Sequence, residues 1–208
     1  MSAVFDWARE ENLQPEPITV EIWKELPEDF CRLVEVENGE AVRAEAPSRP
    51  HQTATFRLAH MVDRAIAEHV DQCRDECLDT SIDFDVLLWE TPRTTIRRPD
   101  LGIYDCAPAD LRPLPADLVK LVIEIVSPGT TRIGPVEKKA EYAIAGIPWY
   151  WIVRIGDNSV SVIEIFVLDH VLGQYRPHAK LTPDEPHTTV DLPIRITIDW
   201  TQLTGLAR

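Results

Sequence analysis

Long apolar runs are missing from this chain of 208 residues. No window approaches the ~20 consecutive apolar residues that a membrane helix needs, and the opening segment MSAVFDWAREENLQPEP has no apolar signal core. The sequence therefore predicts a cytoplasmic protein with no membrane partner. Hydrophobic residues make up 44% and charged residues 27% of the chain, an ordinary composition that disfavours disorder, collagen-like repeats and a fibrous rod.

Cysteine is also scarce. Four cysteines in a chain of this length do not make a disulfide framework, so reduced and mostly packed thiols are expected at Cys31, Cys73, Cys77 and Cys106. Cys73 and Cys77 have the spacing C-x3-C, which invites comparison with a zinc site. No second close pair follows them, and ordinary thiols on a helix face are therefore the favoured interpretation.

Basic residues are outnumbered, because 21 lysines and arginines stand against 35 acids and give a net charge of −14. Such a field repels polyanions, so a protein that coats nucleic acid is disfavoured. The basic residues nevertheless recur in the middle of the chain, at Arg93, Arg97, Arg98, Arg132, Lys138 and Lys139. A local basic patch and an ordinary solvated face both stay open as interpretations of these residues.

Two familiar catalytic motifs are missing as well. No G-x-S-x-G elbow surrounds Ser127, which argues against a serine hydrolase. No G-x-G-x-x-G occurs, and the segment GTTRIG lacks the Lys-Ser/Thr pair of a phosphate loop. Nucleotide cofactors are therefore not implied.

The chain does contain an alternation of hairpin, helix and strand patterns. Asn38-Gly39 between two alternating segments predicts a hairpin with strands at 31–37 and 40–45. The whole pattern is typical of an α+β domain, with a mixed sheet flanked by a few helices. We expect one domain at 19–205 and an N-terminal extension at 1–18.

Helical spacing predicts three helices. The first covers 19–26 with Thr19 as its cap, and the second covers about 49–70 after a serine cap and an early proline. The third lies between Pro135 and Gly146. The apolar residues expected to face inward are Phe56, Ala59, Val62 and Ile66 on the second helix, and Val136, Ala140, Ala143 and Ile144 on the third.

Runs of branched residues predict strands elsewhere. Those expected at the centre of the sheet are 82–89, 98–105 and 118–126. Further strands are expected at 149–155, 159–169, around 171–181 and at 193–199.

Two acids interrupt these strands: Asp100 lies in PDLGIYD and Glu124 in LVIEIVSP. Period-2 alternation puts Glu124 on one face with Val122 and Val126, where a carboxylate requires a partner, a proton or a metal. If the two strands are neighbours the carboxylates converge, and two such side chains plus waters are a common way to hold magnesium. Plainer interpretations stay open: Asp100 caps a strand or pairs with Arg98, and Glu124 is satisfied by an arginine or a tyrosine.

The Pro-Asp on one strand and the Glu on the next resemble the PD-(D/E)XK nuclease arrangement. The segment EIVSPGTTRIGPVEKKAEYAIAGIPWYWIV, with RRPDLGIYD and RLVEVENGE before it, resembles the Uma-two family of restriction-endonuclease-like proteins over nearly the whole chain. The family pattern E-x-x-S-P, then K-x-x-x-Y-x-x-x-G-x-P-x-Y-W, matches this chain at Glu124, Ser127, Pro128, Lys138, Tyr142, Gly146, Pro148, Tyr150 and Trp151.

That resemblance implies a PD-(D/E)XK-type core in which Asp100 and Glu124 bind Mg²⁺ or Mn²⁺, and in which Lys138 is a lysine displaced onto the adjacent helix. Such nucleases use the ion to activate water and to neutralise the transition state, and the lysine to position the nucleophile. Glu35 matches the E-x-x-x-G of the family's first hairpin and is a further candidate carboxylate. His51, in an S-x-P-H stretch, also matches a family position, without a role that the sequence reveals.

Two positions depart from the pattern. Val126 occupies the place where a lysine usually follows the second acid, and Gly134 replaces an Asp that the family commonly has four residues before the motif lysine. Helical periodicity puts Lys139 nearer the apolar face, whereas the K-x-x-x-Y spacing selects Lys138, and we follow the spacing. A solvent-facing Lys138 is the plainer alternative.

Two functions follow. The first is a divalent-metal-dependent endonuclease that hydrolyses phosphodiester bonds in DNA, with Asp100, Glu124 and Lys138 at its site and Glu35 as an accessory acid. The second is a catalytically degenerate module of the same fold that binds a protein or assembles with itself. A homodimer suits either function, because two copies place two sites across a duplex. The matched aromatic residues are expected to pack in the core rather than to stack on bases.

Overall fold

The structure, a computed structural model, describes residues 16–44, 46–127 and 133–206, and most of its strands form two sheets. The large sheet has six strands in the order β11-β10-β9-β8-β6-β3. They are β3 (Leu78–Ile82), β6 (Leu101–Asp105), β8 (Val119–Val126), β9 (Trp149–Ile155), β10 (Val160–Asp169) and β11 (Gln174–Leu181). Because β8 pairs parallel with β9 and antiparallel with β6, the sheet is mixed, as predicted.

The small sheet has five strands in the order β2-β1-β5-β4-β7. They are β1 (Val34–Glu37), β2 (Glu40–Arg43), β4 (Val86–Trp89), β5 (Thr95–Arg97) and β7 (Leu114–Pro115). The short helices near it are α1 (Val20–Glu25), α2 (Glu28–Cys31) and the 3₁₀ turn η3 (Ala116–Leu118). Strands and a few helices thus make the α+β architecture that the sequence predicts.

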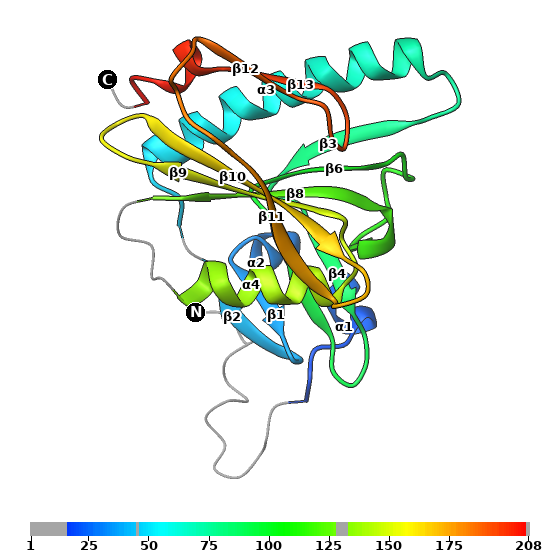
Figure 1. Cartoon of the computed structure of the whole chain (residues 1–208). Helices are drawn as coiled ribbons and strands as arrows, with labels where there is room; N and C mark the ends of the chain where they lie inside the picture. Colours follow the sequence, from blue (N-terminus) through cyan, green and yellow to red (C-terminus); the bar gives the residue numbers. More distant parts are fainter. Residues whose placement is uncertain (1–15, 45, 128–132, 207–208) are drawn as a thin grey trace.

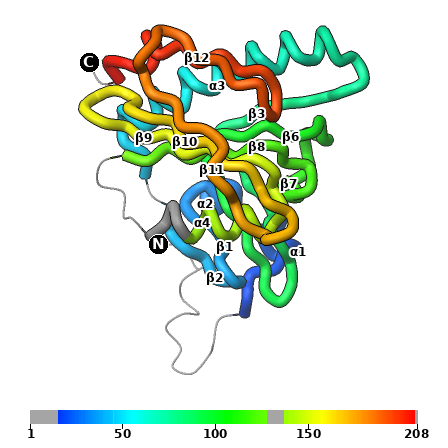
Figure 2. Tube along the Cα trace, viewed as in Figure 1, coloured from blue at the N-terminus to red at the C-terminus, as the bar shows by residue number. Residues whose placement is uncertain are grey.

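Helices cover both faces of the large sheet (Figure 1). The helix α3 (Arg49–Gln72) lies on one face, with the hairpin of β12 (His187–Val190) and β13 (Ile196–Asp199) and the 3₁₀ turn η4 (Trp200–Leu203) beside it (Figures 1 and 2). The helix α4 (Ile133–Ile144) lies on the opposite face, on the side of the small sheet. No helix in the described ranges is long and apolar enough to cross a membrane.

Local signals placed the first hairpin and the starts of α1 and α3, although the strand predicted at 31–37 begins only at Val34, because Cys31 belongs to α2. Asn38 and Gly39 have φ angles of 51° and 81° and join β1 to β2, because the tight turn needs left-handed residues. The hydroxyl of Thr19 accepts the Ile22 N–H at 3.3 Å and caps α1. Ser48 caps α3 in the same way, through the His51 N–H. The helix α2 and the strands β5, β7 and β12 have no counterpart among the predicted elements, and β3 shares only Ile82 with the predicted strand 82–89.

The apolar face of α3 is close to the predicted one, with one exception. Val62 and Ile66 are buried in the core with Leu58, while Ala59 packs partly against it. Phe56 was expected there, but its exposed fraction is 71%. Its neighbours Ala54 and Thr55 are the buried residues at this level of the helix, because the strip that meets the sheet is rotated from the predicted one.

The run 82–89 is not one strand at the centre of one sheet, so that prediction is wrong. Asp83 has a φ of +49°, a left-handed conformation that interrupts the extended chain. The chain therefore leaves the large sheet at the end of β3 and enters the small sheet as β4. The two other central runs, which become β6 and β8, do pair with each other.

The inward face predicted for α4 is right at Ala143 and wrong at Ala140 and Ile144. Ala140 is exposed and Ile144 is 71% exposed, whereas Tyr142 and Ala143 are buried. The side chain of Val136 lies outside the described part of the structure. The half-buried residues on this helix are instead Lys138, Lys139 and Glu141. Lys138 meets the acid Glu35, Glu141 pairs with Arg97, and Lys139 lies over the Phe166 ring.

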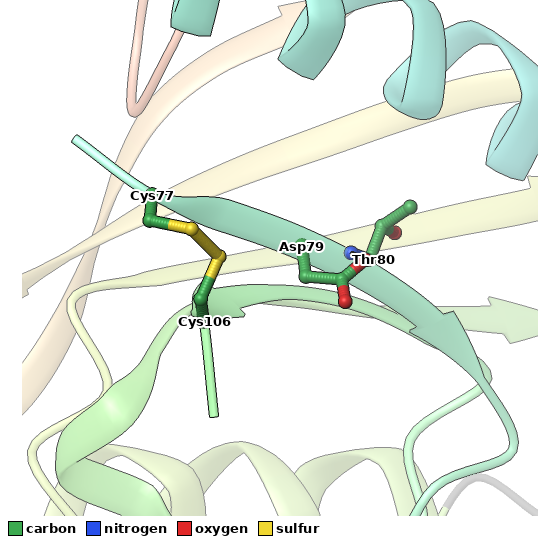
Figure 3. Close-up of a disulfide and its surroundings, with 4 residues drawn as sticks. All are labelled: Cys77, Asp79, Thr80 and Cys106. Carbon is green, nitrogen blue, oxygen red and sulfur yellow. Dashed lines mark hydrogen bonds between the residues drawn. A yellow bond between two sulfur atoms is a disulfide. The ribbon is translucent and has the colours of Figure 1, made fainter. Parts of the chain in front are cut away.

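The expectation of reduced thiols is wrong for one pair, because Cys77 and Cys106 form a disulfide (Figure 3). Cys77 directly precedes β3 and Cys106 directly follows β6, and the pairing of these two strands sets their Cα atoms 5.3 Å apart. Cys31 is a buried thiol, and Cys73 is an exposed thiol at the end of α3. The disulfide removes Cys77 from any zinc site with Cys73.

Candidate active site

Asp100 and Glu124 meet across two neighbouring strands. The ladder between β6 and β8 pairs Leu101 with Ile123, so Asp100, just before Leu101, lies opposite Glu124, just after Ile123. Oδ2 of Asp100 accepts the backbone N–H of Ile125 at 2.6 Å. This bond holds one carboxylate oxygen against β8 and leaves Oδ1 directed away from that backbone.

Glu124 is buried on the face of the large sheet that α4 covers. Its Oε1 accepts a hydrogen bond from the Tyr142 hydroxyl at 2.8 Å. Burial, with the negative charges of Asp100 and Glu35, outweighs the opposing effect of Lys138 and raises the pKa of Glu124 to about 7. Glu124 therefore lies where a positive charge is favourable.

Lys138 comes from α4 and reaches these acids. Its Nζ donates to Oε1 of Glu35 at 2.7 Å and lies 3.6 Å from Oε1 of Glu124. These carboxylates outweigh the effect of burial and raise the pKa of Lys138, so the side chain is a cation at neutral pH. Lys139 points elsewhere, with its Nζ 3.3 Å from the centre of the Phe166 ring.

Glu35 on β1 is surrounded by donors. Lys138 and the Arg98 N–H, at 2.9 Å, both donate to Oε1, and Arg97 donates to Oε2 at 3.1 Å. Burial alone would raise the pKa of Glu35, but Lys138, the Arg98 backbone and Arg97 together hold it below its usual value. Three donors, two of them cationic side chains, bind the two oxygens of Glu35, so this acid anchors Lys138.

His51 and Asp83 lie on the other side of Asp100. Nε2 of His51, in the first turn of α3, lies 2.9 Å from Oδ1 of Asp100. Burial lowers the pKa of His51, but the bond to Asp100 outweighs it and the net pKa is raised. Burial and the charge of Asp100 raise the pKa of Asp83, whose N–H donates to the Asp100 carbonyl at 3.4 Å.

Sequence reasoning did not select Asp83, Arg97 or Glu141 for the site. The predicted strand 82–89 contains Asp83 near its start. The two closely spaced acids of the segment D-F-D, Asp83 and Asp85, were the sequence signal that this strand is interrupted. Arg97 was counted only as one of several surface cations. Glu141 gave no signal, because its partner is 44 residues away in the chain.

The mid-chain basic residues do not form one free patch. Arg97 is 4% exposed and bound to acids, and Arg98 and Arg112 both pair with the buried Asp85. Arg132 lies outside the described residues. A cavity of about 470 Å³ beside the site is lined by residues of both charges, including Arg98, Arg112, Asp83, Asp85 and Tyr104.

The two carboxylates of Asp100 and Glu124 are the groups of this site that could hold a divalent cation. Oxygen ligands are those that Mg²⁺ and Mn²⁺ prefer, and these ions usually keep several waters. The cationic Lys138 lies beside Glu124, and His51 lies beside Asp100. A divalent ion between the two acids would supply positive charge in the same place. Within the described ranges, no group of three or more His, Cys, Asp or Glu side chains is placed to hold a metal. The remaining ligands would then be water or substrate oxygens.

The fold and this meeting of two acids and a lysine define a restriction-endonuclease-like α+β protein. More particularly, the chain belongs to the Uma2 family, described as "Putative restriction endonuclease", whose model matches residues 25–200. A similar solved structure is described as a "putative nuclease belonging to DUF820" from Anabaena variabilis ATCC 29413. The two chains are 13% identical, with a TM-score of 0.60, and the match covers 91% of this chain and 99% of that one. No curated protein matches.

Proposed function

We propose that this chain is a divalent-metal-dependent endonuclease that hydrolyses phosphodiester bonds in DNA. The description of its family supports a nuclease activity. The observation that carries the proposal is the convergence of Asp100, Glu124 and Lys138, which come from two strands and a helix onto one point. That set of side chains is what a nuclease of this type needs, namely two oxygen ligands and a cation.

Asp100 and Glu124 would hold the ion, Mg²⁺ or Mn²⁺. When bound, the ion supplies the activation of water and part of the neutralisation of charge at phosphorus. The bond from the Ile125 N–H orients Asp100, and the Tyr142 hydroxyl orients Glu124. Both carboxylates are thereby fixed before substrate arrives, so little reorganisation is needed.

Lys138 is a charged donor in this reaction and not its base, because its raised pKa keeps the proton on Nζ. From its place near Glu124 it orients the attacking water and stabilises the negative charge that develops on the phosphate oxygens. Hydrolysis adds one water across a P–O bond, leaving a phosphate on one product end and a hydroxyl on the other. Glu35 is the accessory acid that keeps Lys138 at this position.

Cleavage of plasmid and single-stranded DNA, with Mg²⁺ or Mn²⁺, tests the proposal. Asp100→Asn and Lys138→Ala are expected to lower the rate by about 10²-fold or more. Matched controls are Asp169→Asn and Lys120→Ala, which remove one charge from the ion pairs with Arg176 and Asp105. Cleavage that all four variants retain would overturn the proposal and identify a contaminant. Lys139→Ala is expected to cleave like the wild type.

DNA binding and assembly belong to the same proposal. A protein of net charge −14 must meet DNA through a limited surface, so the affinity is expected to fall steeply with salt if several phosphates are contacted. A homodimer would place two sites across a duplex, and sedimentation velocity with and without DNA measures this directly.

A non-catalytic nuclease-fold module is the second candidate. The pairing of Arg97, Arg98 and Lys138 with internal acids favours it, because those charges are already engaged. Calorimetric titration with Mn²⁺ separates the candidates. Binding that Glu124→Gln abolishes supports the enzyme, whereas no binding, or binding indifferent to this substitution, supports the module.

A further inference from the structure

Arg97 is a buried cation that touches three carboxylates. It ends β5, is 4% exposed, and lies between the small sheet and α4. The carboxylates are those of Glu35, Glu37 and Glu141. A guanidinium this deeply buried is stable only with such partners, so its contacts hold the elements that supply them in a defined geometry.

The contact with α4 is the closest one. Nε and Nη2 of Arg97 donate to the two oxygens of Glu141 at 2.6 and 2.7 Å, a bidentate pair with fixed direction. Glu141 follows Lys138 by three residues, so both side chains project from nearly the same side of the helix. The bidentate pair therefore fixes both the rotation and the height of the helical turn that carries Lys138.

The second contact reaches the partner of Lys138. Nη1 of Arg97 lies 3.1 Å from Oε2 of Glu35, while Lys138 binds the other oxygen, Oε1. Arg97 is therefore connected to Lys138 indirectly in two ways, through Glu141 on the same helix and through Glu35. Arg97 and Lys138 share the negative charge of Glu35, so Glu35 attracts Lys138 less strongly than it would alone. Lys138 therefore also interacts with Glu124, whose Oε1 lies 3.6 Å from its Nζ.

We propose that Arg97 is a positioning residue that holds Lys138 over Glu124. A lysine on the strand of the second acid would be placed by the sheet itself, but here Val126 occupies that position and the lysine comes from a helix. Arg97 supplies the placement that the strand does not. This inference rests on the proposed nuclease function for its catalytic consequence, but the placement itself can be measured without activity.

The chemistry requires arginine at this position. Nε, Nη1 and Nη2 make separate contacts with carboxylates on two elements, β1 and α4. A lysine keeps the charge but has one donor atom and no planar fork, so it cannot hold Glu141 in a bidentate pair. Arg97→Lys and Glu141→Gln therefore weaken the placement while changing little of the buried volume.

The first experiment measures the reactivity of Lys138 in the metal-free protein. Acetylation by acetic anhydride, followed by peptide mass spectrometry, uses the exposed Lys180 of β11 as the internal reference. Arg97→Lys and Glu141→Gln are expected to raise the relative rate at Lys138 by about fivefold, because a lysine released from its acids reacts faster. Arg154→Lys, in the surface pair with Glu164, is the matched control. Unchanged reactivity in both variants would overturn the inference.

The second experiment is a double-mutant cycle on DNA cleavage. Arg97→Lys is expected to lower kcat by about tenfold with KM nearly unchanged, and to have no further effect when Lys138 is already alanine. An equal loss in both backgrounds would show a general structural role and overturn the inference. Glu141→Gln takes its place if Arg97→Lys does not fold. If the wild type does not cleave, the acetylation result still decides the placement, and only the nuclease proposal fails.

Discussion

The surroundings of the two buried glutamates of the site, Glu35 and Glu124, shift their pKa values in opposite directions. Glu35 receives donors from Lys138, Arg97 and the Arg98 backbone, which hold its pKa below the usual value. Glu124 has the Tyr142 hydroxyl and a more distant lysine, and burial raises its pKa to about 7. Two glutamates close to the same lysine thus differ in their mean charge near neutral pH. Active sites that use one acid group and one basic group commonly hold two such residues with different pKa values.

The raised pKa of Glu124 predicts a particular dependence of stability on pH. A folded-state pKa above the ordinary value of 4.5 means that the folded protein binds more protons between about pH 4.5 and 7, so the stability falls as the pH rises through this range. Glu124→Gln, which is always neutral, removes this loss. Its melting temperature relative to the wild type is therefore expected to be higher at pH 8 than at pH 5.

Differential scanning fluorimetry with EDTA at the two pH values measures this difference. Asp169→Asn, which changes a half-buried acid paired with Arg176 at the end of β10, is the control and should show no comparable change with pH. The same offset at both pH values for Glu124→Gln would contradict the assignment of a raised pKa.

At the scale of elements, the strand β3 depends on its partner. It is an edge strand of the large sheet, paired only with β6 among the sheet strands of the described chain. The disulfide ties the start of β3 to the end of β6, and the Cys106 N–H donates to the Cys77 carbonyl at 3.0 Å. Asp83 and Asp100 lie at the opposite ends of the same two strands, so the ladder connects the disulfide to the site.

Removal of the disulfide by Cys77→Ser with Cys106→Ser is expected to cost about 3–4 kcal/mol, because the bond closes a loop of 29 residues in the unfolded chain. The melting temperature should fall by about 2–4 °C for each kcal/mol. A reductant should produce the same fall in the wild type and none in the double variant. Cys73→Ser is the control, and a wild type that ignores reductant would contradict the bond.

At the scale of the whole molecule, the C-terminal end of the described chain is joined to the large sheet through α3. Ile196, Ile198, Trp200 and Leu203 are buried in the same core as α3 and the large sheet. Arg57 on α3 donates to the Thr204 carbonyl at 2.8 Å. The C-terminal hairpin is therefore part of the core. The single domain at 19–205 with an N-terminal extension stays a prediction.

Trp200→Ala tests how much the packing of the C-terminal segment against α3 and the large sheet stabilises the fold. The side chain is 3% exposed and its Nε1 donates to the Thr188 hydroxyl at 2.9 Å, so its loss leaves a cavity and an unpaired hydroxyl. We expect a loss of about 3–5 kcal/mol in the free energy of unfolding, measured by urea denaturation. Arg195→Ala, which breaks an exposed pair with Asp191, is the control and should cost less than about 1 kcal/mol. Equal effects would mean that the hairpin is peripheral.

Much of the fold could be predicted because its signals are local. The Asn38-Gly39 turn, the cap at Thr19 and the branched strands depend on residues within a few positions of each other. The candidate acids were found because each interrupts an apolar strand, and Lys138 was found through the family resemblance. The structure brings Asp100, Glu124 and Lys138 together, and their catalytic roles stay a proposal. Helix faces were less predictable, because packing against a sheet selects the buried strip.

Short-range chemistry along the chain thus specified the elements, their caps and the residue types of the site. The disulfide, the break at Asp83 and the ion cluster around Arg97 depended instead on strand register and on the approach of α4 to both sheets. Their partners are separated by tens of residues, so no local spacing encodes them. Contacts of this kind exist only once burial of the apolar faces has fixed which segments are neighbours, which is the physical reason they appear in the fold and not in the pattern.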